Sequence, residues 1–408
     1  MTTLPDALTV YKNGGVKLFN LTAEQIIEHN AVHTTREIHQ QPAVWQELVS
    51  AFFEQQAIYK EFLTAIYNKH DHVRVILTGA GTSAFVGDTL VPELARHNRH
   101  NVRFESIPTT DIVSNPTAYF FKDTPTILVS FARSGNSPES VATVSLGQQI
   151  VKDFYQVVIT CNKDGQLAKN IQGDVNCMTM LMPEKSNDQS LAMTSSFTSM
   201  ITAAYALFTE DIFTPAVAQQ VIASAEVFAE QLGDSIDAVL GFDFERIVYL
   251  GSGPLAQLSH EAALKMLELS GGQVVAIHES SLGFRHGPKS ILNDKSVVAL
   301  FMSQDPYTRK YDLDILRELA AAKSGMKIVV LTEIDDEEVA GLADWVVTVN
   351  AGTEPFANDF NLAVLYVMFA QTLAMKKSIQ LGITPDNPSP DGAISRVVKG
   401  VTIYGYQK

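Results

Sequence analysis

Residues 74–81 read RVILTGAG, and residues 246–253 read RIVYLGSG. Each stretch is an apolar run that ends in a glycine-rich turn, which is typical of a strand buried on both faces of a parallel sheet. Three further pairs follow in the same order at offsets of 170 or 171 residues: DTPTILVS (123–130) with DKSVVALF (294–301), QVVIT (156–160) with KIVVL (327–331), and DVNCMT (174–179) with DWVVTV (344–349). Four ordered matches predict an internal duplication.

Stretches with helical spacing lie between these runs, for example at 137–151 and 313–324. Alternating strands and helices predict βαβ units with right-handed crossovers. The sequence therefore predicts the α/β class, with two tandem, doubly wound parallel-sheet domains at residues 45–215 and 216–390.

The two ends of the chain are expected to lie outside these domains. Residues 1–44 are predicted to be helical, because Thr22 and Gln25 can form a capping box and Pro42 can start a new helix. Residues 391–408 are predicted to form a tail after a stretch rich in proline. This tail is either exposed or folded over another part of the protein.

Bulk composition restricts the class of protein. The chain has 408 residues, of which 46% are hydrophobic and 18% are charged, as expected of a globular protein with large cores. Its net charge of −15 argues against nucleic-acid binding. No apolar run approaches the roughly 18 residues of a membrane helix, and no signal peptide is visible. With only Cys161 and Cys177, neither at metal-ligand spacing, we expect a cytoplasmic protein without disulfides or metal.

Two turns at predicted strand ends are suited to holding a phosphate. The first contains Gly81, Thr82 and Ser83, and the second contains Ser134 and Ser137, with Arg133 beside them. Ligands of doubly wound sheets bind beyond the carboxyl ends of the strands, where backbone N–H groups, hydroxyls and helix N-termini can hold an anion. Two hydroxyl-rich turns on neighbouring strands favour a phosphate monoester.

Other interpretations of these turns remain open. Residues 79–84 also match the G-x-G-x-x-A pattern of dinucleotide-binding proteins, with Glu105 in the position of a ribose-binding acid. Either turn can also be an ordinary strand-to-helix connection, with Ser137 as a plain helix N-cap.

Candidate acid–base residues lie in the second half. Lys265 and Glu268 are spaced i, i+3, so they share one face of a predicted helix. His286 lies in a Gly-Pro loop and can exchange protons near neutral pH. An ordinary surface ion pair and a solvated loop histidine are the alternatives.

Taken together, these motifs resemble the sugar-isomerase (SIS) domain family, with its flavodoxin-like fold, and in particular the isomerase half of glucosamine-6-phosphate synthase. The matching segments are GAGTS (79–83), SGNS (134–137), ALKMLE (263–268), HGP (286–288) and KGVT (399–402). Within this family the chain resembles AgaS-type proteins, through REIHQQP (36–42) and HESSLGFRHGP (278–288). The resemblance covers nearly the whole chain after residue 30.

The resemblance implies roles for individual residues. Ser83, Ser134 and Ser137 would bind the phosphate, and Glu268 would move a proton between C1 and C2 of the sugar. Lys265 could form an imine with the sugar carbonyl. His286 would open the ring and reach the site from a partner subunit, which implies a homodimer or homotetramer with a shared site. Lys399 would close over the sugar as part of a C-terminal lid. No cofactor is implied.

Two departures from the family pattern qualify these expectations. The S-Q-S-G turn of the family is Ala132-Arg133-Ser134-Gly135 here, so one hydroxyl is missing and Arg133 can compensate for it. Glucosamine-6-phosphate synthase carries a glutaminase with an N-terminal cysteine, whereas this chain begins Met1-Thr2. We therefore expect no amide-dependent synthesis.

The implied reaction converts galactosamine 6-phosphate and water into tagatose 6-phosphate and ammonia. Plain aldose–ketose isomerisation of a sugar 6-phosphate is the first alternative, because the same residues would support it. A sugar-phosphate-binding regulator is the second, although a sensor has no need of Lys265, Glu268 and His286 together. For either enzyme, a phosphate cradle from the first half and a carboxylate–amine pair from the second half must serve one substrate.

Overall fold

The computed structural model describes residues 17–97, 101–322, 325–398 and 400–407, and its chain forms two compact units. The first-sheet unit comprises Ala43–Asp188, Met193–Gln219 and Ile394–Lys408. The second-sheet unit comprises Met1–Pro42, Gln189–Ala192 and Gln220–Ala393.

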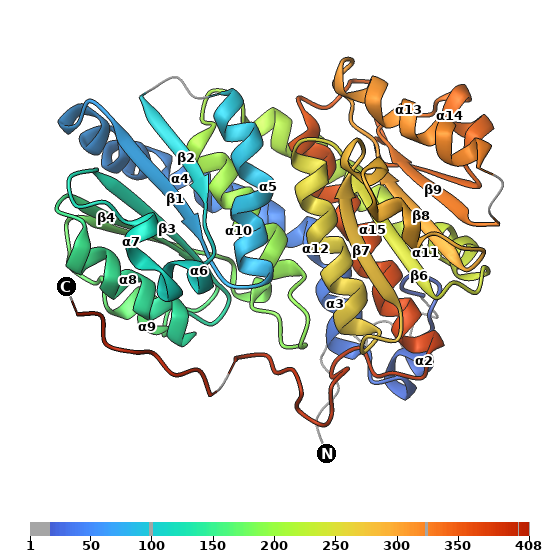
Figure 1. Ribbon diagram of the computed structural model, residues 1–408, viewed down its shortest axis with the longest axis horizontal. Coiled ribbons are helices and arrows are strands. Elements are labelled where there is room, and N and C mark those ends of the chain that lie inside the picture. The colour runs from blue at the N-terminus through green and yellow to red at the C-terminus, as the bar shows by residue number, and fades with distance from the viewer. Residues whose placement is uncertain (1–16, 98–100, 323–324, 399, 408) are drawn as a thin grey trace. The chain divides into compact units, whose positions relative to one another are not determined.

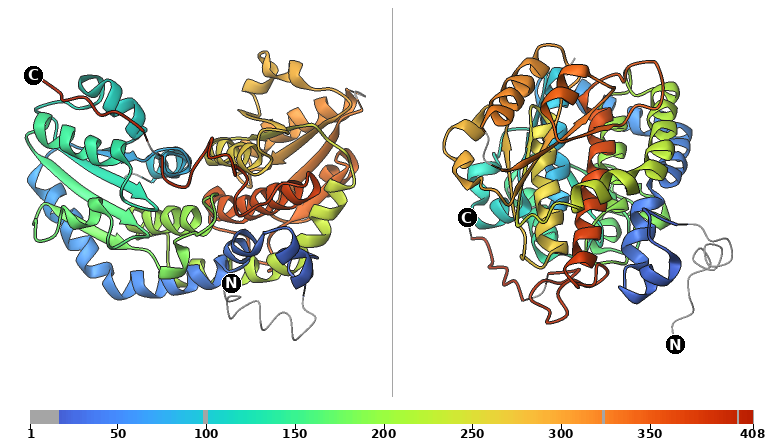
Figure 2. Two further views of the ribbon diagram at one scale, coloured as in Figure 1. Left: turned by 90° about the horizontal axis from the view of Figure 1, so that it is seen from below. Right: turned by 90° about the vertical axis from the view of Figure 1, so that its right-hand side faces the viewer.

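The first-sheet unit contains a parallel five-stranded sheet with the order β2-β1-β3-β4-β5 (Figure 1). Its strands are β1 (Val73–Thr78), β2 (Val102–Ser106), β3 (Thr126–Ala132), β4 (Phe154–Thr160) and β5 (Cys177–Leu181). Its helices are α4 (Gln41–Lys69, which begins in the other unit), α5 (Thr82–Arg96), α6 (Thr109–Ser114), α7 (Pro116–Tyr119), α8 (Pro138–Ile150), α9 (Gln166–Lys169), η1 (Glu184–Ser186) and α10 (Ser195–Phe208). Helices α5 and α10 pack together on one face of the sheet, and α6 and α8 pack together on the other (Figure 2).

The second-sheet unit repeats this arrangement with the order β7-β6-β8-β9-β10. Its strands are β6 (Arg246–Gly251), β7 (Val275–Ser280), β8 (Ser296–Phe301), β9 (Lys327–Thr332) and β10 (Trp345–Thr348). Its helices are α2 (Ala23–Glu28), α3 (Val32–His39), α11 (Pro215–Leu240, which begins in the other unit), α12 (Pro254–Leu269), η2 (Gly283–Arg285), η3 (Pro288–Ile291), α13 (Thr308–Ala321), α14 (Glu337–Leu342) and α15 (Asp359–Gln380). The prediction of two doubly wound parallel-sheet domains is confirmed.

The glycine turns after β1 and β6 have the same backbone conformation. Gly81 has φ 56° and ψ −131°, and Gly253 has φ 56° and ψ −129°. These angles lie in a region that residues with a Cβ rarely adopt. A Cβ on Gly79 would lie 2.5 Å from the carbonyl carbon of Ser83, so each turn depends on glycine for both conformation and space.

The predicted helix signals near the N-terminus are also present. Thr22 and Gln25 form a reciprocal capping box at the start of α2. Helix α3 ends at His39, and α4 begins at Gln41 with Pro42 in its first turn, where a missing N–H costs no hydrogen bond.

Helix α15 is long and apolar enough to cross a membrane by length and composition. However, 94% of its most apolar stretch is buried inside the protein, where it packs against α12. This burial is typical of a core helix.

Candidate active site

The first candidate turn connects β1 with α5 in the first-sheet unit. Gly81 is the N-cap of α5, and Thr82 and Ser83 are its first two residues. Both side chains are almost fully buried, and Ser83 Oγ lies 3.9 Å from Met193 Sδ. The N–H groups of Ser83 and Ala84 donate to the carbonyl oxygens of Ala80 and Gly81, at 3.2 and 2.8 Å, so the N-terminus of this 15-residue helix favours an anion mainly through its partial positive charge.

The second candidate turn lies at the same edge of the sheet, because β1 and β3 are hydrogen-bonded neighbours in parallel register. Ser134 is partly exposed, and its Oγ accepts a hydrogen bond from the N–H of Asn136 at 3.3 Å. Gly135 has φ 69°, which makes the turn tight. Ser137 is the N-cap of α8, but its side chain makes no capping hydrogen bond. Its hydroxyl is therefore not used in the way that an ordinary N-cap would use it.

Arg133 follows directly after β3, and its side chain is 6% exposed. Its Nη2 donates to the carbonyl oxygen of Arg396 in the C-terminal tail, at 2.9 Å. A guanidinium has five N–H donors, so this bond does not preclude a contact with an anion. Compensation for the missing hydroxyl at Ala132 stays a prediction.

The acid–base candidates Lys265 and Glu268 lie on α12 in the second-sheet unit. Lys265 Nζ is 2.5 Å from Glu268 Oε2 and 3.3 Å from Glu261 Oε1. The side chains of Lys265 and Glu261 are completely buried, whereas that of Glu268 is 22% exposed. The ion pair of Lys265 and Glu268 therefore lies largely in the protein interior, and is not the surface ion pair that the i, i+3 spacing also allowed. Glu268 is the member of this group that solvent or a ligand can reach.

Neighbouring carboxylates decide whether the Lys265 amine is protonated. Burial alone would lower its pKa, but the carboxylates of Glu261 and Glu268 outweigh burial, and the pKa of Lys265 is raised. Lys265 is thus an ammonium group at neutral pH. An ammonium donates hydrogen bonds and stabilises negative charge, but it has no lone pair with which to attack a carbonyl.

Among the described residues, no hydrogen bond or ion pair joins His286 to Lys265 or Glu268. His286 follows η2 and is exposed, and its backbone N–H donates to the carbonyl oxygen of Gly283 at 2.9 Å. Lys399 lies outside the described residues. Both roles stay predictions.

Two features of α12 were missed by sequence reasoning. Glu261 was not singled out, although its i, i+4 spacing to Lys265 was a usable signal. His260 stacks on His278 of β7, with ring centroids 3.9 Å apart and an interplanar angle of 13°. No pattern in the sequence links two residues on different elements in this way.

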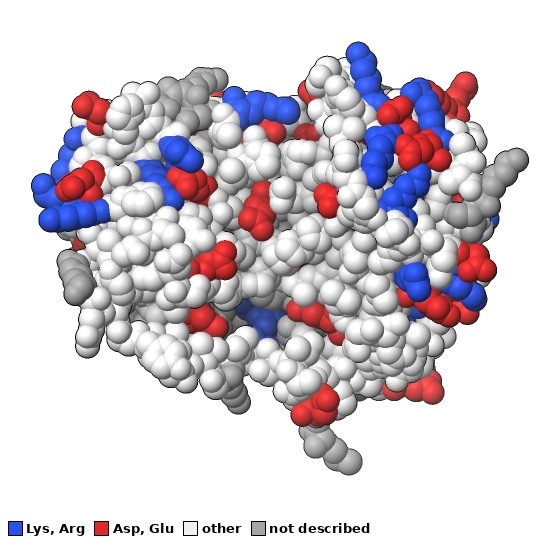
Figure 3. Space-filling model, viewed as in Figure 1, with Lys and Arg blue, Asp and Glu red and all other residues white. Residues whose placement is uncertain are grey.

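Surface charge is mixed on the face shown in Figure 3, where basic side chains lie among acidic ones. In the second-sheet unit, for instance, Arg285 and Lys289 both pair with Glu318. Both cysteines are free, and burial raises the pKa of each thiol to about 12. Among the described residues, no three His, Cys, Asp or Glu side chains gather in a way that could hold a metal ion.

Two tandem five-stranded parallel sheets with helices around them define a two-domain α/β protein of the doubly wound class. The SIS domain family matches residues 67–210 and again residues 242–378, so the chain belongs to the SIS domain family.

Curated relatives match over almost their full length. The D-galactosamine-6-phosphate deaminase AgaS of Escherichia coli is 40% identical over 375 residues, which cover 92% of this chain and 96% of that protein. The protein of the same name from Shewanella sp. (strain ANA-3) is also 40% identical, covering 95% and 96%. The crystal structure of tagatose-6-phosphate ketose/aldose isomerase from Escherichia coli has a TM-score of 0.84 at 38% identity, covering 92% and 97%.

Proposed function

We propose that this SIS-domain enzyme is a D-galactosamine-6-phosphate deaminase that converts galactosamine 6-phosphate and water into tagatose 6-phosphate and ammonia. The choice of galactosamine 6-phosphate as substrate is supported by relatives named D-galactosamine-6-phosphate deaminase, which are 40% identical over more than nine-tenths of the chain. The observation that carries the chemistry is the pair of Lys265 and Glu268, in which a buried ammonium contacts a carboxylate that is partly exposed.

The phosphate is assigned to the turns after β1 and β3. Ser83, Ser134 and Ser137 provide hydroxyls, and the N-termini of α5 and α8 provide N–H groups and partial positive charge. Gly81 and Thr82 shape the first turn, and Arg133 adds a charge next to the second. This set needs no metal or cofactor to hold a phosphate monoester.

The reaction begins with ring opening, which is assigned to His286. Glu268 then takes the C2 proton, which the C1 aldehyde acidifies, and returns it to C1. The product of this transfer is a C2 imine with a hydroxyl on C1. Water attacks this imine, the C2–N bond breaks, and ammonia leaves a ketone behind.

Lys265 is assigned an electrostatic role. As an ammonium it stabilises the negative charge that develops on the substrate oxygen during proton transfer, and it holds the Glu268 carboxylate in place. The raised pKa disfavours the alternative in which Lys265 itself forms an imine with the sugar.

A plain aldose–ketose isomerase is the second candidate. It is supported by the similarity to the Escherichia coli tagatose-6-phosphate ketose/aldose isomerase, which is 38% identical to this chain. If C2 carried a hydroxyl, the same proton transfer would yield a ketose without loss of ammonia. The two activities differ in the substrate and in the final hydrolysis.

We further propose a homodimer or homotetramer in the cytoplasm, in which His286 of one chain completes the site of another. The exposed His286 ring and the two free cysteines are compatible with this arrangement. Lys399 is assigned to the lid that closes over the sugar.

The experiment that tests the function is incubation with galactosamine 6-phosphate, glucosamine 6-phosphate and tagatose 6-phosphate, with ammonia and ketose measured separately. We expect equal amounts of ammonia and ketose from galactosamine 6-phosphate. Interconversion of tagatose 6-phosphate with an aldose, without ammonia from either amino sugar, would favour the plain isomerase.

A further inference from the structure

The turns after β6 and β8 repeat, within the second-sheet unit, the arrangement of the two candidate phosphate turns. Strands β6 and β8 are hydrogen-bonded neighbours in parallel register, so both turns lie at one edge of the sheet. The likeness extends to single hydrogen bonds. Ser281 donates to the carbonyl oxygen of Gly251 from its N–H at 2.7 Å and from its hydroxyl at 3.1 Å, and Thr109 donates to Gly79 in the same way at 2.8 and 3.1 Å. The second-sheet unit therefore carries a cradle of the same kind as the one assigned to phosphate in the first-sheet unit.

This second cradle, which comprises Ser252, Ser281, Ser303 and Gln304, is occupied by a carboxylate from α13. The hydroxyls of Ser252 and Ser281 both donate to Asp312 Oδ1 at 2.6 Å, and the N–H of Ser303 donates to Asp312 Oδ2 at 2.9 Å. Asp312 is fully buried. Burial raises the pKa of Asp312, and the hydrogen bonds from these three donors counter part of that rise, because they favour the charged carboxylate.

A second carboxylate, from Asp359 at the start of α15, bonds further donors of the turn after β8. The hydroxyl of Ser303 donates to Asp359 Oδ2 at 2.6 Å, and the N–H of Gln304 donates to Asp359 Oδ1 at 2.9 Å. Asp359 is almost fully buried. Two internal carboxylates thus accept hydrogen bonds from groups that, at an open strand end, would be available to an external anion.

The cradle of the first-sheet unit differs at the equivalent position. Asp312 lies 171 residues after Val141, which is the offset between the strands that precede α13 and α8. Val141 packs against the hydrophobic core of its unit and carries no charge. Among the described residues, no carboxylate is hydrogen-bonded to the hydroxyl of Ser83, Ser134 or Ser137. The second cradle therefore contains an anion of its own, whereas the first does not.

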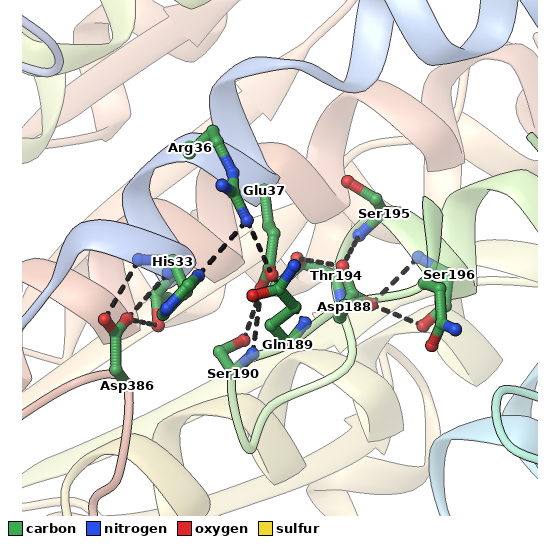
Figure 4. Close-up of polar contacts among 12 residues, drawn as sticks. His33, Arg36, Glu37, Asp188, Gln189, Ser190, Thr194, Ser195, Ser196 and Asp386 are labelled. Carbon is green, nitrogen blue, oxygen red and sulfur yellow. Dashed lines mark hydrogen bonds and ion pairs between the residues drawn. The ribbon is translucent and has the colours of Figure 1, made fainter. Parts of the chain in front are cut away.

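The chain fills a cluster of donors with its own carboxylate in one more place, at the start of α10. Asp188 is fully buried, and its carboxylate accepts hydrogen bonds from the backbone N–H groups of Thr194, Ser195 and Ser196, at 2.8, 3.0 and 2.9 Å (Figure 4). A buried aspartate can thus take the place of an external anion where several donors converge.

We propose that Asp312, supported by Asp359, is a built-in substitute for phosphate in the second cradle, so that each chain binds one sugar phosphate and binds it in the first-sheet unit. The placement of that one sugar phosphate rests on the proposed function, whereas the occupation of the second cradle does not. Because Ser252 immediately precedes the N-cap of α12, the same carboxylate also holds the start of the helix that carries Lys265 and Glu268.

The first arm of the test counts binding sites in the full-length protein by isothermal titration calorimetry with galactitol 6-phosphate, which carries a phosphate but has no carbonyl group and so does not react. We expect one site per chain. Ser134→Ala should weaken this site about tenfold, because a hydrogen bond to a charged group is lost, and Ser252→Ala, the matched change in the second cradle, should leave its Kd unchanged.

The possible failures of this arm are distinguishable. Two sites per chain would overturn the proposal, and so would a single site that Ser252→Ala weakens and Ser134→Ala does not. The absence of binding by the wild type would instead contradict the proposed function, and the second arm would then decide the proposal.

The second arm does not depend on the substrate. Asp312→Ala removes the carboxylate and leaves space for formate, so the melting temperature of this variant should be higher in sodium formate than in sodium chloride of equal concentration, by about 2 °C or more. The wild type should show no such difference. Asp314→Ala is the matched control, because Asp314 lies on the same helix with its side chain 63% exposed, and it should also melt alike in both salts.

Equal melting temperatures of folded Asp312→Ala in the two salts would overturn the proposal. Folding of this variant in formate but not in chloride would support it. If the variant folds in neither salt, the titration decides, because that arm needs no substitution at Asp312.

Discussion

The Nζ atom of Lys265 lies 2.5 Å from Oε2 of Glu268, yet the lysine side chain is completely buried and the glutamate side chain is 22% exposed. The buried charge is balanced from both sides, since Glu261 lies 3.3 Å from the same amine. Removing either partner of such a buried group leaves an uncompensated charge, which costs about 3–5 kcal/mol in comparable cases. The buried ammonium of Lys265 therefore holds the carboxylate of Glu268 in a position where that carboxylate is still partly exposed.

The charge state of Lys265 makes a prediction about covalent chemistry. Because its pKa is raised, we expect no imine between Lys265 and the sugar, and sodium borohydride added during turnover should leave the mass of the protein unchanged. Mass spectrometry of the intact chain checks this. A reduced sugar-phosphate adduct that disappears in Lys265→Met would show that the amine is a nucleophile after all.

Substitutions that remove one hydroxyl at a time test the second candidate turn, which contains Ser134 and Ser137. We expect Ser134→Ala and Ser137→Ala each to raise KM for the phosphate ester about tenfold, since a hydrogen bond to a charged group contributes roughly 1.5–3 kcal/mol, with a smaller effect on kcat. Ser145→Ala is the matched control, because Ser145 is exposed further along α8. An unchanged KM in both turn variants would remove this turn from the phosphate site.

How far the sequence predicts this site differs from residue to residue. The repeated apolar runs and glycine turns predicted both sheets, because buried strands and positive-φ turns restrict which residues are allowed. The spacing of Lys265 and Glu268 predicted their contact, because helical geometry brings i and i+3 together. Burial of the pair, and the contribution of Glu261, depend on how α12 packs against α15 and β7, which no local pattern encodes.

Local sequence patterns also could not predict contacts between segments that are far apart in the sequence. The tail was predicted to be either exposed or folded over another part, and the bond between Arg133 and the carbonyl of Arg396 joins residues 263 positions apart. A backbone carbonyl carries no side-chain signal, so the sequence could not single it out as a partner.

The stacked pair of His260 and His278 predicts how stability depends on pH. Burial, together with the neighbouring His278, lowers the pKa of His260 from 6.5 to about 4. The folded state then binds fewer protons than the unfolded state between these values, so the unfolding free energy falls as the pH drops from 6.5 towards 4. Allowing for solvent screening of a half-buried ring, we expect a loss of about 1 kcal/mol at pH 5.

Thermal unfolding between pH 7.5 and 4.5 measures this effect. His260→Phe keeps an aromatic ring beside His278 but cannot be protonated, so its melting temperature should fall less at low pH than that of wild type. His72→Gln, at an exposed histidine in the first-sheet unit, should follow the wild-type curve. Identical pH dependence in wild type and His260→Phe would refute the assignment.

The exposed His286 ring predicts complementation between chains. If His286 serves a partner's site, mixing the inactive variants Glu268→Gln and His286→Ala should restore part of the activity, because one site of each mixed dimer then carries both wild-type residues. The measurement is turnover after the two variants are refolded together, with mixed dimers isolated by two different affinity tags. No recovery in isolated mixed dimers would place His286 outside a shared site.

The most direct test of Glu268 as the proton-transfer base is turnover of galactosamine 6-phosphate in deuterated water by wild type and Glu268→Gln. Release of ammonia and incorporation of deuterium at C1 of the ketose are both measured. We predict that the wild type yields both, and that Glu268→Gln still binds the phosphate ester but loses about 100-fold or more of the turnover, as expected for a general base. Ammonia release at the wild-type rate by a correctly folded Glu268→Gln would contradict the central assignment.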